Sequence, residues 1–225
     1  MQKPVRYRRS TLAVVGCGGV GSWVAIGLSR LKHKVVLIDG DKIERKNLDR
    51  QLFTEADIGK HKAEALANRI NSMLGTEYAY DNTYVSPGWT CNVDAVLCCV
   101  DNNPARIACL EWADATKRPV VIGANEVLSS EAYLYCGDIG SPTDPRVMYP
   151  SMLTDHSGDP LSPCAALAAD NTQSAAANYN AAHGILWLLN TALDPRFRTS
   201  LRQYAPTHVS YTPTHINIRR SNESA

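Results

Sequence analysis

The sequence has no long apolar segment and no excess of charge. None of its apolar runs approaches the roughly 18 residues that suggest a membrane-spanning helix, and the residues before the first run are polar and basic rather than signal-like. Lys and Arg number 23, against 22 Asp and Glu. We therefore expect a cytoplasmic protein with neither a membrane nor a nucleic acid as partner.

The cysteine pattern also excludes common site types. The chain has seven cysteines, an odd number, and no C-x-x-C pair. Cys98 and Cys99 fall inside a predicted buried strand, so a disulfide framework is not expected. Without C-x-x-C pairs, a structural zinc site of four cysteines is not expected either.

The chain length of 225 residues fits one sizeable α/β domain. We expect residues 1–225 to form a single domain with a nucleotide-binding core over 10–124. Prolines together with Asp, Ser and Gly predict that residues 137–170 form a long crossover loop without regular structure, either functional or disordered. Residues 171–219 should contribute a helix and the terminal strands.

A glycine-rich stretch near the N-terminus carries the clearest functional signal. Four glycines follow the first apolar run: Gly16, Gly18, Gly19 and Gly21. Apolar residues then recur at helical spacing through Leu31, and a second apolar run ends at Asp39. Glycines leave backbone N–H groups open to a phosphate, and an acidic residue after the next strand can accept hydrogen bonds from a ribose. The stretch indicates a nucleotide site, with tight packing alone as the structural alternative.

The remaining pattern predicts a doubly wound α/β fold. Helices are expected from the N-cap Asp57 to Gly75, from Pro104 to Lys117, and over 175–193. Strands are expected over 12–15, 35–38, 76–80, 95–100, 119–123 and 131–136, with a terminal hairpin over 207–212 and 214–219. We therefore expect a Rossmann-like, mostly parallel sheet with helices on both faces and a short antiparallel C-terminal extension.

Further motifs follow the glycine turn in a fixed order. They are Asp39-x-Asp41, Asn47-Leu48-x-Arg50-Gln51, Gly59-Lys60-x-Lys62 and Asp101-Asn102. Together with Gly16-x-Gly18-Gly19-x-Gly21, they resemble the ThiF, MoeB and HesA family of adenylyltransferases and the adenylation domains of ubiquitin-activating enzymes. NAD-binding Rossmann proteins need neither the N-L-x-R-Q segment nor the later Lys and Asp.

The resemblance implies a role for each residue in the activation of a carboxylate by ATP. Arg50 and Lys62 would neutralise the phosphates, Asn47 and Gln51 would support them, Asp39 would hold the ribose, and Asp101, beside Asn102, would hold Mg²⁺. Asp41 would line the site or only shape the loop. Taken singly, Arg50 and Lys62 have the alternative of being solvated cations, and Asp101 that of capping the next helix.

Cys164 is a second candidate for chemistry. It lies in the proline-rich segment, where thiamine-type members of the family carry a cysteine that can bond to the C-terminus of the activated protein. The resemblance implies thioester formation there, and the alternative is a passive loop cysteine.

The chain also departs from its apparent family. MoeB-type relatives have an N-terminal helix whose arginine enters the neighbouring subunit's ATP site, and here Arg6, Arg8 or Arg9 would have to replace it. The C-x-x-C pairs of zinc-binding relatives are missing, and no separate catalytic-cysteine or ubiquitin-fold domain is evident. We expect a minimal form of the family and, like its relatives, a homodimer.

The expected function is ATP- and Mg²⁺-dependent adenylation of a carboxylate. The expected substrate is the C-terminal glycine of a ubiquitin-like protein. Three alternatives stay open: adenylation of a small-molecule, peptide or tRNA-borne carboxylate, an NAD(P)-dependent oxidoreductase, and a non-catalytic nucleotide-binding scaffold.

Overall fold

One eight-stranded sheet organises the computed structural model, which describes residues 9–125, 129–154, 174–194, 206–212 and 215–220. The strand order is β3-β2-β1-β4-β5-β6-β7-β8. The strands are β1 Thr11–Val15, β2 Lys34–Ile38, β3 Ala79–Asp81, β4 Ala95–Cys98, β5 Val120–Asn125, β6 Ser130–Tyr135, β7 Pro206–Tyr211 and β8 Ile216–Arg220. Every predicted strand is present, with its ends shifted by a few residues.

The helices, with 3₁₀ turns labelled η, connect these strands. They are α1 Gly19–Leu28, η1 Arg45–Asn47, η2 Glu55–Asp57, α2 Lys62–Leu74, α3 Asn103–Thr116, α4 Pro145–Met148, η3 Pro150–Leu153 and α6 Ala175–Leu193. The bounds of α6 match the prediction, because the Ser174 hydroxyl accepts a hydrogen bond from the N–H of Ala177 and thereby caps the helix. None of the described helices is long and apolar enough to cross a membrane.

The strand order of the sheet reverses between β1 and β4, which is the topological switch point of the fold. Strand β1 pairs in parallel with both β2 and β4, so the chain builds outward through β2 and β3 and then returns to the other side of β1. In such sheets the ligand binds outside the carboxyl ends of the strands at this switch point. Strands β6, β7 and β8 then add in antiparallel order. The predicted mostly parallel sheet with an antiparallel extension is confirmed.

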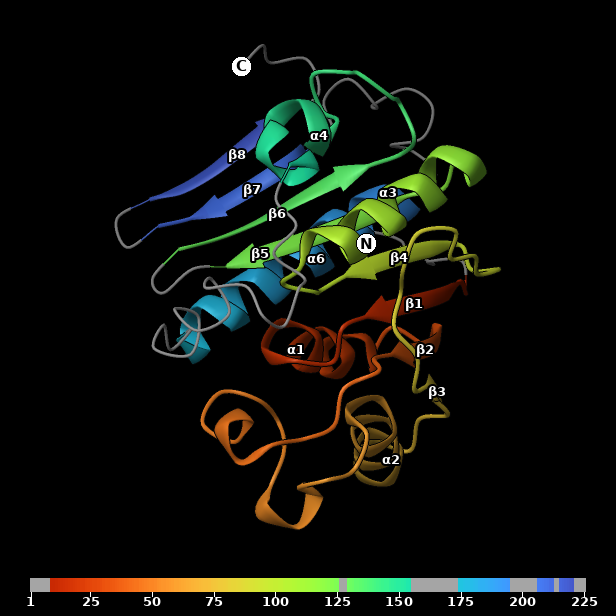
Figure 1. The fold of residues 1–225 in the computed structure, drawn as a ribbon, viewed down its shortest axis with the longest axis vertical. Coiled ribbons are helices and arrows are strands. Elements are labelled where there is room, and N and C mark those ends of the chain that lie inside the picture. The colour runs from red at the N-terminus through yellow and green to blue at the C-terminus, as the bar shows by residue number, and fades with distance from the viewer. Residues whose placement is uncertain (1–8, 126–128, 155–173, 195–205, 213–214, 221–225) are drawn as a thin grey trace, which may run out of the picture.

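Helices cover both faces of the sheet (Figure 1). Helices α1, α2 and α6 share one core cluster with the strands, whereas α3 and η3 pack on the opposite face through Trp112 and Met152. Helices α1 and α6 meet closely at Gly27, where an added Cβ would lie 2.3 Å from Leu186 Cδ1. The two layers of helices bury β1 and β4 on both sides, which explains their continuous apolar sequences.

Three local predictions are wrong. Helix α2 starts at Lys62 with His61 as its N-cap, because Asp57 instead ends η2 and bonds to the N–H of Thr54, which begins that turn. Helix α1 ends at Leu28, since the N–H of Leu31 closes a turn on the Leu28 carbonyl. The segment 137–170 is not free of structure, because α4 and η3 lie within its described part.

Candidate functional site

The glycine turn brings backbone close to backbone at the switch point. Gly16 has φ of +90°, and a Cβ there would lie 2.9 Å from the Cys99 carbonyl group. A Cβ on Gly21 would lie 1.8 Å from the Gly16 oxygen. Gly18 is the N-cap of α1 and supplies no side-chain cap. The first N–H groups of α1 therefore have no side-chain acceptor from the N-cap, an arrangement that suits an anion.

Asp39 braces this turn from the end of β2. Its Oδ2 atom accepts a hydrogen bond from the Cys17 N–H at 2.7 Å, and its Oδ1 atom accepts one from the Asp41 N–H at 2.8 Å. Burial raises the pKa of Asp39 above its ordinary value, although the Lys62 charge opposes this shift. The carboxylate is thus fixed in place at the edge where the ribose is predicted.

Lys62 is the electrostatic centre of the site. It is 8% exposed, and its Nζ donates to Asp41 Oδ2 at 2.7 Å. Burial alone would lower the pKa of Lys62, but the nearby carboxylates of Asp39, Asp41 and Asp101 raise it, so the ammonium stays charged. Burial alone would raise the pKa of Asp41. Hydrogen bonds from the Lys62 ammonium and the Tyr84 hydroxyl instead hold the pKa of Asp41 below its ordinary value. Asp41 is therefore the direct partner of Lys62.

The residues after β4 divide into two roles. Asn102 is the N-cap of α3, since its Oδ1 atom accepts from the Ala105 N–H at 3.0 Å. The capping role considered for Asp101 is therefore wrong. The Asp101 charge instead acts on Lys62 from the end of β4. Its predicted part in metal binding remains a prediction.

The N-L-x-R-Q segment reaches the same turn through Gln51. Asn47 is buried, and its Oδ1 atom accepts from the Glu44 N–H at 2.9 Å, which caps η1. The Arg50 guanidinium donates to Asp49 Oδ1 and to the Lys46 carbonyl, each at 2.9 Å. Gln51 faces Gly18, with its Nε2 atom 3.6 Å from the position of an added Cβ. The Gln51 side chain thus lies against the glycine turn. The Arg50 guanidinium instead contacts Asp49 and the Lys46 carbonyl.

Three buried polar atoms at this edge lack a hydrogen-bond partner among the described residues. They are Gln51 Oε1, Asn82 Oδ1 and Asn178 Nδ2. Asn82 directly follows β3, and Asn178, on α6, accepts from Asn125 Nδ2 at 2.7 Å and lies against Gly19. Unpaired buried polar groups are costly. A polar ligand such as a nucleotide fits this edge, because it would supply the missing partners.

The sequence reasoning missed Asn82, Asn125 and Asn178. One signal was available for Asn178, because Gly19 is not required by the G-x-G-x-x-G pattern. A Cβ at Gly19 would lie 2.4 Å from Asn178 Nδ2, so this glycine makes room for α6. No comparable signal marked Asn82 or Asn125.

The described residues contain no group of three or more His, Cys, Asp or Glu side chains arranged to hold a metal ion. Mg²⁺ in nucleotide sites is usually held by one or two carboxylates together with phosphates and water. The predicted single ligand Asp101 is compatible with that pattern. Cys164, Arg6 and Arg8 lie outside the described residues, and Arg9 is exposed.

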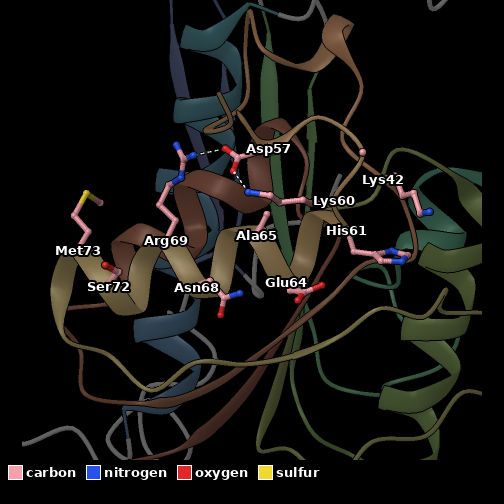
Figure 2. A pocket seen from close by; sticks show the side chains of 11 residues that line it. Lys42, Asp57, Lys60, His61, Glu64, Ala65, Asn68, Arg69, Ser72 and Met73 are labelled. Carbon is pink, nitrogen blue, oxygen red and sulfur yellow. Dashed lines mark hydrogen bonds and ion pairs between the residues drawn. The ribbon is translucent and has the colours of Figure 1, made fainter. Parts of the chain in front are cut away.

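A separate pocket of about 720 Å³ lies along the outer side of α2 (Figure 2). Figure 2 shows Asp57 between Arg69 and Lys60, with which it forms ion pairs. The pocket is lined by neighbours of Lys62 in sequence, but Lys62, Asp39 and the glycine turn do not line it. The polar residues at the carboxyl edge of the sheet therefore lie outside this pocket.

The sheet, its switch point and the glycine turn define a protein of the doubly wound, Rossmann-like class. The sequence profile of the ThiF family matches residues 3–223, and the chain belongs to that family.

Curated relatives are similar over about half of this chain. Ubiquitin-like modifier-activating enzyme 5 of Drosophila persimilis is 36% identical over 136 residues, which covers 49% of this chain and 35% of the relative. The protein of the same name from Drosophila willistoni is 39% identical over 121 residues, which covers 46% and 30%. The chain thus spans about a third of the length of these relatives.

Solved structures show the same fold across nearly the whole chain. PaaA superposes with a TM-score of 0.68 at 18% identity, over 94% of this chain and 64% of PaaA. E. coli MccB with ATP superposes with a TM-score of 0.66 at 17% identity, over 96% and 64%. At this identity the likeness concerns the fold alone.

Proposed function

We propose that this chain uses ATP and Mg²⁺ to adenylate a carboxylate. One observation carries the proposal: the buried Lys62 ammonium lies at the switch point, among three carboxylates that keep it charged. A fixed charge in a site shielded from water stabilises the phosphate charge that develops during such a reaction. Membership of the ThiF family supports an adenylyltransferase-type enzyme.

In the proposed reaction the chain binds and orients the nucleotide and neutralises the charge of its phosphates. The first N–H groups of α1 and Lys62 would bind the phosphates, and Arg50 would exchange its contact with Asp49 for one with a phosphate. Asp39 would hold the ribose, and Asp101 is the proposed Mg²⁺ ligand. Bound Mg²⁺ would supply further positive charge at the phosphates. A bond forms between the carboxylate oxygen and the α-phosphorus while the bond to pyrophosphate breaks.

The proposed substrate is the C-terminal glycine carboxylate of a ubiquitin-like protein. Support comes from the relatives, which are named ubiquitin-like modifier-activating enzymes. A peptide, small-molecule or tRNA-borne carboxylate would use the same chemistry with a different acid. Assembly as a homodimer is likewise a proposal from the family resemblance.

The test is ATP–pyrophosphate exchange with the purified protein, alone and with candidate ubiquitin-like proteins. We expect exchange only when the carboxylate partner is present, and a roughly hundredfold lower rate in Arg50→Ala and in Asp101→Ala. Arg45→Ala is the control, because Arg45 is an exposed cation paired with Glu55. Unchanged rates in both site variants would remove the proposed mechanism, and exchange with a small acid alone would remove the proposed substrate.

The identity of the nucleotide can be tested independently of turnover. ATP should raise the melting temperature, since a ligand that binds only the folded state stabilises it. A shift with NAD⁺ and none with ATP would favour the oxidoreductase alternative. ATP binding without exchange for any acid would favour the scaffold alternative.

The use of Cys164 as a nucleophile is a proposal from the family resemblance. Its thiolate would attack the acyl carbon of the adenylate, so that a thioester forms and AMP leaves. Cys164→Ala should then keep pyrophosphate exchange but lose a thiol-sensitive conjugate on denaturing gels. A conjugate that persists in the variant would exclude this cysteine.

A further inference from the structure

The carboxyl edge of the sheet presents three neighbouring segments in the order of a nucleotide's parts. The glycine turn follows β1, Asp39 follows β2, and the loop beginning at Asn82 follows β3. Neighbouring strands lie about 4.8 Å apart, and the Asp39 N–H donates to the Asp81 carbonyl at 3.1 Å, so these segments are adjacent. With phosphates at the turn and ribose at Asp39, the base extends toward the loop after β3.

Tyr84 is the aromatic residue at that position. It is 70% exposed, yet its hydroxyl donates to Asp41 Oδ1 at 2.8 Å. Its ring lies over Gly40, where an added Cβ would be 2.6 Å from ring atom Cδ2. Asp41 is in turn held by Lys62 at 2.7 Å. The ring is therefore fixed beside Asp39 and still open to a ligand.

We propose that Tyr84 is a nucleotide-binding residue whose ring packs against the base of bound ATP. Asp41 is the positioning residue that holds the ring, and Gly40 leaves the space it occupies. This inference deepens the proposed function and rests on it. Aromatic rings bind bases by stacking, and a tethered ring loses little freedom on binding. The unpaired Oδ1 atom of Asn82 supplies a hydrogen-bond acceptor on the same loop.

The experiment compares a ligand that has a base with one that has none. Affinities for ATP and for inorganic triphosphate, the latter by competition with ATP, are measured by titration calorimetry. We expect Tyr84→Ala to weaken ATP binding about tenfold and to leave triphosphate binding unchanged. Tyr84→Phe keeps the ring and should remain within about threefold of the wild type. Tyr80→Ala is the matched control, an exposed tyrosine on β3.

A second readout reports the ring directly. The H2 and H8 protons of bound ATP should shift upfield in the wild type and in Tyr84→Phe, but not in Tyr84→Ala. Equal losses of ATP and triphosphate affinity in Tyr84→Ala, or a Tyr84→Phe variant as weak as Tyr84→Ala, would overturn the role of the ring. A Tyr84→Ala variant that binds ATP as the wild type does would also overturn it. A wild-type protein that binds no ATP would instead overturn the proposed function, and this inference with it.

Discussion

In the parallel half of the sheet Lys62 lies among carboxylates, and in the antiparallel half Arg146 lies between Asp114 and Asp144. The Arg146 guanidinium donates to both carboxylates and to the Tyr135 hydroxyl, and uses all three of its nitrogens. Among the described residues, the Lys62 ammonium donates one hydrogen bond, to Asp41 Oδ2. An ammonium has three donors. We call the Arg146 cluster saturated, because each guanidinium nitrogen has a partner, and it joins α4 to α3. We call the Lys62 cluster unsaturated, because its ammonium has donors left for a ligand.

The largest effect is expected from breaking the saturated cluster. Arg146→Met leaves two carboxylates without their cation, and Asp144 is 1% exposed. The free energy of unfolding in urea should fall by about 3–5 kcal/mol. Arg45→Met is the control, because its ion pair with Glu55 is exposed and should contribute less than about 1 kcal/mol. Equal losses in the two variants would show that the Arg146 cluster does not fasten the fold.

A smaller effect, on activity, is expected from the unsaturated cluster. Lys62→Met should lower the rate of ATP–pyrophosphate exchange per folded molecule about hundredfold, which is roughly 2.7 kcal/mol of transition-state stabilisation. Lys60→Met removes a neighbouring lysine whose side chain is 56% exposed and pairs with Asp57. That control should stay within about twofold of the wild type. A wild-type rate of exchange in Lys62→Met would show that the Lys62 cluster has a structural role, like that of Arg146.

The pH dependence of stability should have opposite signs in the two clusters, with smaller effects. Burial would raise the pKa of Asp144, but hydrogen bonds from the Arg146 side chain and from backbone N–H groups hold it below its ordinary value of 3.8. Its stabilising contribution is present above pH 3.8 and is lost as the pH falls through the lowered native pKa. The stability advantage of the wild type over Asp144→Asn should therefore disappear in acid.

Asp39 should behave in the reverse way. Burial raises its pKa, so the folded state holds the Asp39 proton more tightly than the unfolded state does. Ionisation of Asp39 then costs stability as the pH rises from 3.8 through the raised pKa. Relative to Asp39→Asn, the wild type should gain stability as the pH falls through that window. Parallel curves for the two proteins in urea unfolding at several pH values would contradict this sign.

Local sequence patterns predicted the helices and strands better than they predicted the roles of single polar residues. Helix α6 was predictable to its ends, because the N-cap Ser174 and the Asp194-Pro195 pair are local signals. Gly75 ended α2 as predicted, with φ of +67°. Asp57 was misassigned as the cap of α2, because it accepts from the Thr54 N–H in its own 3₁₀ turn and pairs with Arg69 in the middle of α2. Sequence spacing alone cannot distinguish a cap from such an ion pair.

The sequence by itself determined the order of strands and helices, the glycine turn and the family of this protein, because apolar periodicity and turn chemistry act between neighbours in the chain. Only the tertiary structure decided which polar groups meet. Lys62 finds its carboxylates at the ends of two different strands, Asn178 reaches Gly19 from α6, and Tyr84 reaches Asp41 from the loop after β3. These contacts depend on strand order and helix packing, which bring together residues far apart in sequence.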